Sequence, residues 1–344
     1  MKKNLLLLGL AVAAMTSCTN EEVLSELQES PKAISFDSFV NKATRAVTPT
    51  DANISKFYAY AYYGTDQTVF NGEKVTKSDS KWGYTHTAYW TQNVYQFAAY
   101  ADGNNGDSLT NVAFADEKLT ISSYTVSDAK DLVADVIKKD NSNFGVAAQD
   151  VQFTFEHLLT KVKFNIINTS PDYKMKITAL TVTGAKATGK VDVTANGAVW
   201  TGDANASAVT YTPVAASADA YIAKYDNNSA ACKVSSEEMF VMPQNLANVK
   251  FSITATFYDD NNQVVATKTF TDAAFAGKKR TDNDAKEAVE AWAPGTSYEY
   301  TLSLPVAARP IVFGNPGIDE WDTCVVELNP TGNNEGVQSP TPAN

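Results

Sequence analysis

Segments with the two-residue period of β-strands follow one another along most of this chain, and this pattern limits its fold more than any other feature. Examples lie at residues 57–62, 95–100, 151–157 and 249–258. Successive side chains of a strand point to opposite faces of a sheet, so each segment can bury one face in a core. Turn dipeptides such as Asn-Gly and Asp-Gly lie between segments, at spacings typical of a β-sandwich. The sequence therefore predicts an all-β protein.

The length of the chain allows two domains. It has 344 residues, of which 44% are hydrophobic and 19% charged, enough for two buried cores. We expect one β-sandwich over residues 46–149 and another over residues 150–328. Residues 329–344 are rich in Pro, Gly, Asn and Thr, which predicts a disordered tail. One short helix is expected over residues 282–292, because Ala285, Val289 and Trp292 fall near helical spacing.

Composition and charge argue against several classes of function. The net charge is −11, whereas nucleic acids and anionic membrane surfaces are bound by clustered Lys and Arg, so no nucleic-acid partner is expected. Residues 184–190 fit the first part of a phosphate-binding loop, but Val191 stands where Ser or Thr would hold Mg²⁺. His86 and His157 are the only histidines, and we expect His157 to be a sheet residue. We predict no catalytic residue, cofactor or metal site, and therefore no enzyme.

The first residues have the pattern of an export signal. Residues 1–17 combine a basic start with an apolar run that is too short to span a bilayer, which needs about 20 residues. The run ends in Met-Thr-Ser-Cys, which resembles the lipobox of bacterial lipoproteins. We expect residues 1–17 to be a signal peptide and Cys18 to be the lipidated first residue of the mature protein, anchored in a membrane. An ordinary cleaved signal peptide or an uncleaved apolar helix are the alternatives.

A strand pattern followed by an arginine comes next. Ile34, Phe36 and the residues up to position 40 alternate in the manner of a strand, and a polar stretch then ends at Arg45. Exposed polar loops are where proteases cut. We expect an arginine-specific protease to cleave between Arg45 and Ala46, so that residues 18–45 form a lipidated propeptide with a removable strand.

Taken together, these features resemble the fimbrillin family, the subunits of type V pili in Bacteroidetes. The residues that carry the likeness are Cys18 and residues 34–45, 131–134, 155–162, 242–244, 292–295, 298–302, 311–313 and 318–321. The resemblance implies two transthyretin-like β-sandwich domains in tandem. It also implies a lipid-anchored precursor that loses its first strand to an arginine-specific protease. The subunits then polymerise into surface fimbriae by donating strands to other pilus subunits.

The donor strands are expected in the C-terminal region, over residues 311–328. The apolar residues that share a strand face there are Ile311 with Phe313, and Cys324 with Val326 and Leu328. A strand with apolar residues at alternate positions can fill a groove that has an apolar floor and unpaired backbone groups, which is β-strand addition.

Two questions stay open at the level of sequence. One is whether Cys232 and Cys324 form a disulfide, because sequence alone cannot place their Cα atoms. The other is whether the chain is instead a monomeric surface lipoprotein that binds a glycan or a host ligand, with its C-terminal strands folded back on their own domain. Fibre formation after arginine-specific cleavage separates the two functions.

Overall fold

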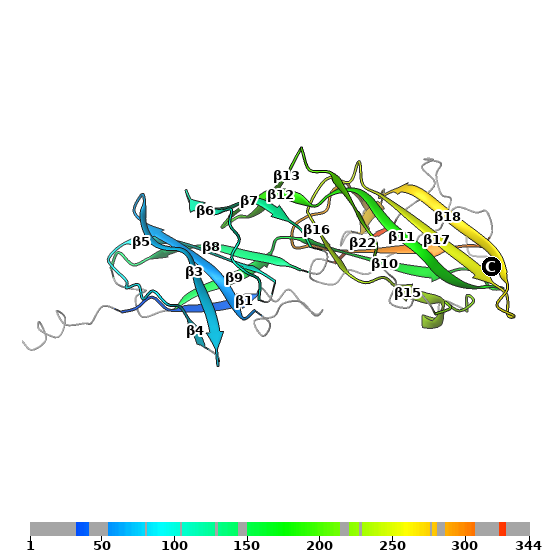
Figure 1. Cartoon of the computed structure of the whole chain (residues 1–344), viewed down its shortest axis with the longest axis horizontal. Coiled ribbons are helices and arrows are strands. Elements are labelled where there is room, and N and C mark those ends of the chain that lie inside the picture. Colours follow the sequence, from blue (N-terminus) through cyan, green and yellow to red (C-terminus); the bar gives the residue numbers. More distant parts are fainter. Residues whose placement is uncertain are drawn as a thin grey trace, which may run out of the picture.

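A computed structural model describes most of the chain (Figure 1). The described residues are 32–40, 54–79, 81–103, 105–127, 130–143, 150–213, 220–226, 229–275, 277–280, 286–306 and 323–327. At 38–40, 277–280, 286–288 and 323–327 only the backbone is described. Within these ranges the regular structure is β-strand, apart from one 3-10 turn, Ala230–Cys232. The prediction of an all-β fold is confirmed.

A seven-stranded sheet forms one end of the molecule (Figure 1). Its strands, in spatial order, are β1 (Phe36–Val40), β9 (Val151–His157), β8 (Leu132–Asp140), β5 (Val94–Asp102), β2 (Lys56–Tyr63), β3 (Gln67–Ser78) and β4 (Lys81–Gly83). Both faces of this sheet are buried. Along β2, Phe57 and Ala59 point into one core, whereas Tyr58 and Tyr60 point into another. The aromatic alternation of the sequence thus serves two cores at once.

A smaller sheet covers one face of the first. Its order is β13 (Gly197–Gly202), β12 (Thr188–Thr194), β7 (Lys118–Thr125) and β6 (Val112–Ala115). Leu119 and Ile121 of β7 and Val191 and Val193 of β12 are buried in the core that also holds Tyr58. The first sandwich is therefore completed by a hairpin that comes from much later in the chain.

Two further sheets pack on each other at the other end of the molecule (Figure 1). One contains β15 (Lys233–Ser235), β10 (Thr160–Asn168), β21 (Ser297–Leu304), β22 (Thr323–Glu327), β19 (Gly277–Arg280) and β20 (Lys286–Val289), with β16 (Met239–Val241) also paired to β10. The other contains β14 (Ala208–Tyr211), β11 (Lys174–Lys186), β17 (Lys250–Tyr258) and β18 (Val264–Ala274). Phe164, Phe251 and Trp292 are among the largest side chains in the core between them.

Strand pairs join residues on opposite sides of the expected domain boundary at 149/150. β9 pairs with β8 and β1 in the first sheet, and β12 pairs with β7 over Thr188↔Thr125 to Val193↔Leu119. A sequence reading that follows chain order cannot foresee these pairs, because their partners are far apart in sequence. The first sandwich therefore contains strands from both sides of the expected boundary.

The short helix expected over residues 282–292 is wrong. Residues 286–289 form β20, whose backbone pairs with β19 in the register Gly277↔Val289 to Arg280↔Lys286. Residues 281–285 lie outside the described part of the chain. Val289 and Trp292 are buried, as the apolar pattern predicted. A short apolar spacing fits a helix or a strand, and backbone pairing with β19 makes this segment a strand.

The close packing of β12 against Met242 and β13 predicts the effect of a substitution at Gly189. A Cβ added there would lie 2.7 Å from Sδ of Met242 and 2.8 Å from the backbone oxygen of Thr201. Gly189→Ala should therefore lower the free energy of unfolding by about 1–3 kcal/mol, the usual effect of overpacking. Urea denaturation followed by circular dichroism measures it.

Gly83 in β4 provides the matched control, because a Cβ built there meets nothing within 4 Å. Gly83→Ala should change the free energy of unfolding by less than about 0.5 kcal/mol. Equal effects of the two substitutions would show that the contact of β12 with Met242 and β13 is not close-packed.

Candidate functional site

The predicted site residues fall partly outside the described part of the chain. Cys18, Arg45, Ala46, Ile311, Phe313 and Leu328 lie outside it, as do the expected signal peptide and tail. Cys324 and Val326 lie in β22, where the backbone alone is described. Of the expected removable strand, Ile34 and Phe36 are described with their side chains, and the site is built from them.

Residues 32–36, here called the N-terminal segment, are hydrogen-bonded on both sides. On one side the N–H of Ile34 donates to the oxygen of Ala88 (2.8 Å), and the N–H of Trp90 donates to the oxygen of Lys32 (3.0 Å). On the other side the N–H of Val151 donates to the oxygen of Ser35 (2.7 Å). From Phe36 onwards β1 runs parallel to β9 at the end of the seven-stranded sheet. The segment therefore lies between two other backbones.

Two side chains fix this segment to the first core. Ile34 is 1% exposed and Phe36 is 5% exposed. The ring of Phe36 packs against four other aromatic rings, those of Phe70 and Tyr84 at 5.4 Å, Phe57 at 5.8 Å and Phe153 at 6.0 Å between centroids. Burying such a side chain stabilises by about 1.5–3 kcal/mol, and aromatic pairs add roughly 0.5–1.5 kcal/mol.

Tyr84 holds the segment through its backbone. Its hydroxyl donates to the oxygen of Ile34 (2.5 Å) and accepts from the N–H of Ala88 (3.4 Å). Burial raises the pKa of Tyr84, so the hydroxyl keeps its proton and stays a donor. A contact to a carbonyl oxygen does not depend on the identity of the side chain. The hydroxyl of Tyr84 thus holds the backbone of the segment, while its ring packs on Phe36.

The surface that receives the segment is here called the acceptor groove. Its members are Phe57, Phe70, Tyr84, residues 88–90, Asp150, Val151 and Phe153. The sequence predicted a strand here and a groove beneath it, but not which residues line the groove. Residues 84–88 carry no strand pattern, and their neighbours in space come from strands before and after them in the chain.

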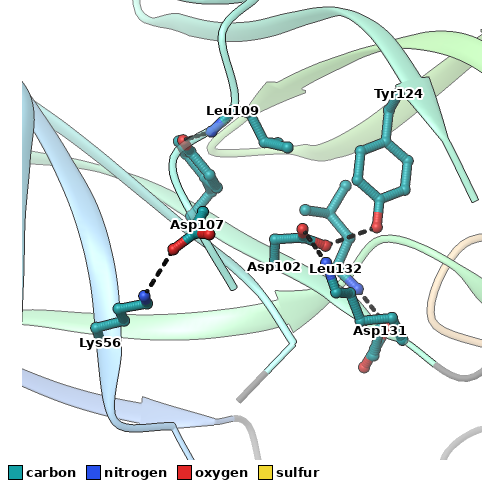
Figure 2. A network of polar contacts seen from close by, with 9 residues as sticks. Lys56, Asp102, Asp107, Leu109, Tyr124, Asp131 and Leu132 are labelled. Atoms are coloured by element: carbon teal, nitrogen blue, oxygen red, sulfur yellow. Dashed lines mark hydrogen bonds and ion pairs between the residues drawn. The ribbon is translucent and has the colours of Figure 1, made fainter. Parts of the chain in front are cut away.

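A partly buried polar network lies at the end of β5 (Figure 2). Asp102, at the end of β5, accepts a hydrogen bond from the hydroxyl of Tyr124 (2.8 Å) and forms an ion pair with Nζ of Lys130 (2.7 Å). Burial first, and then the Asp102 carboxylate, raise the pKa of Tyr124, so that its hydroxyl remains a donor. The charge of Asp102 is thus met by partners of the same chain, as a buried carboxylate requires.

Asp131 lies next to this network. One of its carboxylate oxygens accepts from the N–H of Leu132 (2.9 Å), and the other contacts Nδ1 of His157 at the end of β9. His157, the last residue of β9, lies in a sheet, as expected.

Within the described ranges no group of three or more His, Cys, Asp or Glu residues is placed to hold a metal ion. No helix among the described residues is long and apolar enough to cross a membrane.

The C-terminal strand pairs with its own chain in this structure. β22 lies parallel to β21 in the register Cys324↔Tyr298 and Val326↔Tyr300, and β19 adjoins it at Lys279↔Val326. This arrangement is the one expected if the chain is a monomeric surface lipoprotein whose C-terminal strands fold back on their own domain. Cys232 is a buried free thiol whose Sγ contacts the oxygen of Ser229 at 3.0 Å.

Comparisons with known proteins give a family and several similar solved structures. Residues 44–321 match the model of a family described as fimbrillin-like. A crystal structure of a fimbrial protein from Bacteroides vulgatus has a TM-score of 0.55 at 17% identity, covering 87% of this chain and 98% of that one. The fimbrial anchor protein Mfa2 from Porphyromonas gingivalis has a TM-score of 0.31 at 12% identity, covering 76% and 97%. No curated protein sequence matches the chain.

The geometry of the site predicts how firmly Phe36 holds the N-terminal segment. Phe36→Ala removes four ring contacts, so the free energy for opening the segment should fall by roughly 3–5 kcal/mol, as for other buried aromatic residues. Hydrogen exchange at the amide of Ile34 reports this opening. The exposed Lys32 supplies the control, because Lys32→Ala keeps every backbone bond and should leave the exchange rate nearly unchanged. Equal exchange in both variants would contradict the assignment of Phe36 as the anchor.

Proposed function

Because the chain belongs to the fimbrillin-like family, we propose that it is a structural subunit of a surface pilus with a role in adhesion. The proposal includes two transthyretin-like sandwiches and a structural rather than an enzymatic role. The observation that supports it best is the N-terminal segment, which is hydrogen-bonded on both sides and anchored by Ile34 and Phe36 in a groove that another strand could fill.

The proposed precursor is an outer-membrane lipoprotein. Residues 1–17 act as the signal peptide, and the lipid on Cys18 holds the chain at the membrane. Each buried CH₂ of an acyl chain contributes about 0.8 kcal/mol, so several chains anchor a protein firmly. The anchor lasts only while residues 18–45 remain joined to the rest of the chain.

An arginine-specific protease then cuts between Arg45 and Ala46. β1 ends at Val40, and residues 41–45 separate it from the proposed cut. Cleavage leaves the N-terminal segment bound only by its contacts in the groove, and its departure frees the subunit from the membrane.

Departure of the segment leaves backbone groups without partners. The N–H groups of Trp90 and Val151 and the oxygen of Ala88 lose their hydrogen bonds, and the rings of Phe57 and Phe153 lose the cover of Phe36. An unpaired edge over an apolar floor favours strand addition. A strand from the C-terminal region of another subunit, over residues 311–328, fills the groove. Because this head-to-tail contact does not close on itself, the product is a filament.

The second candidate function is a monomeric surface lipoprotein that binds a glycan or a host ligand. The pairing of β22 with β21 favours this second function, because the C-terminal strand is then already paired within its own chain. In the pilus subunit the same pairing is a stored form of the strand, which leaves β21 when a groove becomes available.

Arg45→Ala tests the proposed function. The variant should stay at precursor size with Cys18 still attached and form no fibres, whereas the cleaved wild-type chain should begin at Ala46 and polymerise. N-terminal sequencing and electron microscopy provide the readouts. Arg280→Ala is the control, because Arg280 ends another basic run, Lys278-Lys279-Arg280, and should leave processing intact. Wild-type fibres whose subunits still begin at Cys18 would contradict the proposal.

A further inference from the structure

We propose that residues 309–313 of a second copy occupy the acceptor groove in the register of residues 32–36; this inference rests on the proposed function. The two segments read Lys-Ala-Ile-Ser-Phe and Arg-Pro-Ile-Val-Phe. In this alignment a basic residue stands first, isoleucine third and phenylalanine fifth in both. The groove thus receives from the neighbouring subunit the same pair of anchors that the propeptide supplied.

The side-chain sites of the groove match this pair. Ile34 and Phe36 are both buried, whereas Ser35 between them is exposed. Ile311 takes the site of Ile34. Phe313 replaces Phe36 among the four aromatic rings that surround it. Lys32 is exposed, so the guanidinium of Arg309 can stay in water at that position.

The backbone bonds also permit the exchange, including its proline. The groove uses the oxygens of Lys32, Ile34 and Ser35 and the N–H of Ile34. Residues 309, 311 and 312 can supply all four. Among the hydrogen bonds of the described residues, none has the N–H of Ala33 as its donor. Pro310, which has no N–H, falls at this one position. Proline also favours extended backbone in the residue before it, as a strand requires.

The other apolar strand of the C-terminal region fits the groove less well. Residues 324–328 place Cys, Val and Leu on one face, with no aromatic side chain for the site of Phe36. A smaller side chain there would leave a cavity among four rings. The groove therefore favours residues 309–313 over residues 324–328.

Disulfide trapping in fibres tests the register directly. The side chain of Ser35 contacts the carboxylate of Asp150, so residue 312 of a neighbour should lie beside position 150. The test variant is Asp150→Cys with Val312→Cys, and the control is Asp150→Cys with Val325→Cys. Both carry Cys324→Ser, and Cys18 leaves with the propeptide. The test variant should give a ladder of cross-linked subunits on a non-reducing gel, and the control should stay monomeric.

The remaining outcomes separate the register from the proposed function. Fibres that cross-link through position 325, or through neither position, would overturn the register while strand donation stands. Absence of fibres from the cleaved Cys324→Ser parent and from the cleaved wild type would defeat the proposed function, and the register would fall with it.

A peptide of residues 307–316 gives a second measurement that needs no assembly. It should bind to the cleaved monomer, and Phe313→Ala in the peptide should weaken binding at least tenfold. Val312→Ser restores the residue that the N-terminal segment carries beside Asp150, so this peptide should bind at least as tightly as the parent. Equal binding of the Phe313→Ala peptide, or binding by a peptide of residues 320–330 alone, would overturn the proposal.

Discussion

Residues 32–36 are held in the first sandwich by backbone pairing on both sides. Hydrogen bonds join this segment to residues 88–90 on one side and to Val151 on the other, and Phe36 fills the space below. All contacts of this strand with the first core are non-covalent. Once the chain is cut beyond it, the strand is a ligand of the sandwich, and a strand with the same pattern can compete for its place. In the proposed assembly, the stability of the subunit and the binding of its neighbour thus use the same contacts.

The seven-stranded sheet has a separate core on each face, so the proposed exchange can leave the rest of the subunit intact. β12 and β13 follow β11 of the second sandwich along the chain, but β12 pairs with β13 and with β7 in the first sandwich. The acceptor groove lies on the opposite face of the seven-stranded sheet, in a different core from β12. Loss of the N-terminal segment therefore opens one core, while the other core keeps its contacts.

Local patterns in the sequence predicted the parts of the fold that local patterns determine. The alternation at 57–62 and 151–157 marks β2 and β9, and Ile34 and Phe36 have the burial expected of the removable strand. The pairing of β12 with β7 could not be predicted, because the local pattern of a strand does not indicate which distant strand it pairs with. The helix over 282–292 failed because β19 supplied backbone partners that the apolar spacing did not reveal. Tyr84 was missed for a similar reason, since its role comes from contacts with Ile34 and Ala88.

Hydrogen exchange at the amides of Trp90 and Val151 shows whether the acceptor groove opens on cleavage and is filled again in the fibre. Both amides donate to the N-terminal segment, so they should be protected in the precursor, exchange rapidly in the cleaved monomer, and be protected again in the fibre. The amide of Ala255, in the middle of β17, should stay protected in all three states. Protection of Trp90 and Val151 that does not change on cleavage would show that the groove never opens, and would contradict the account.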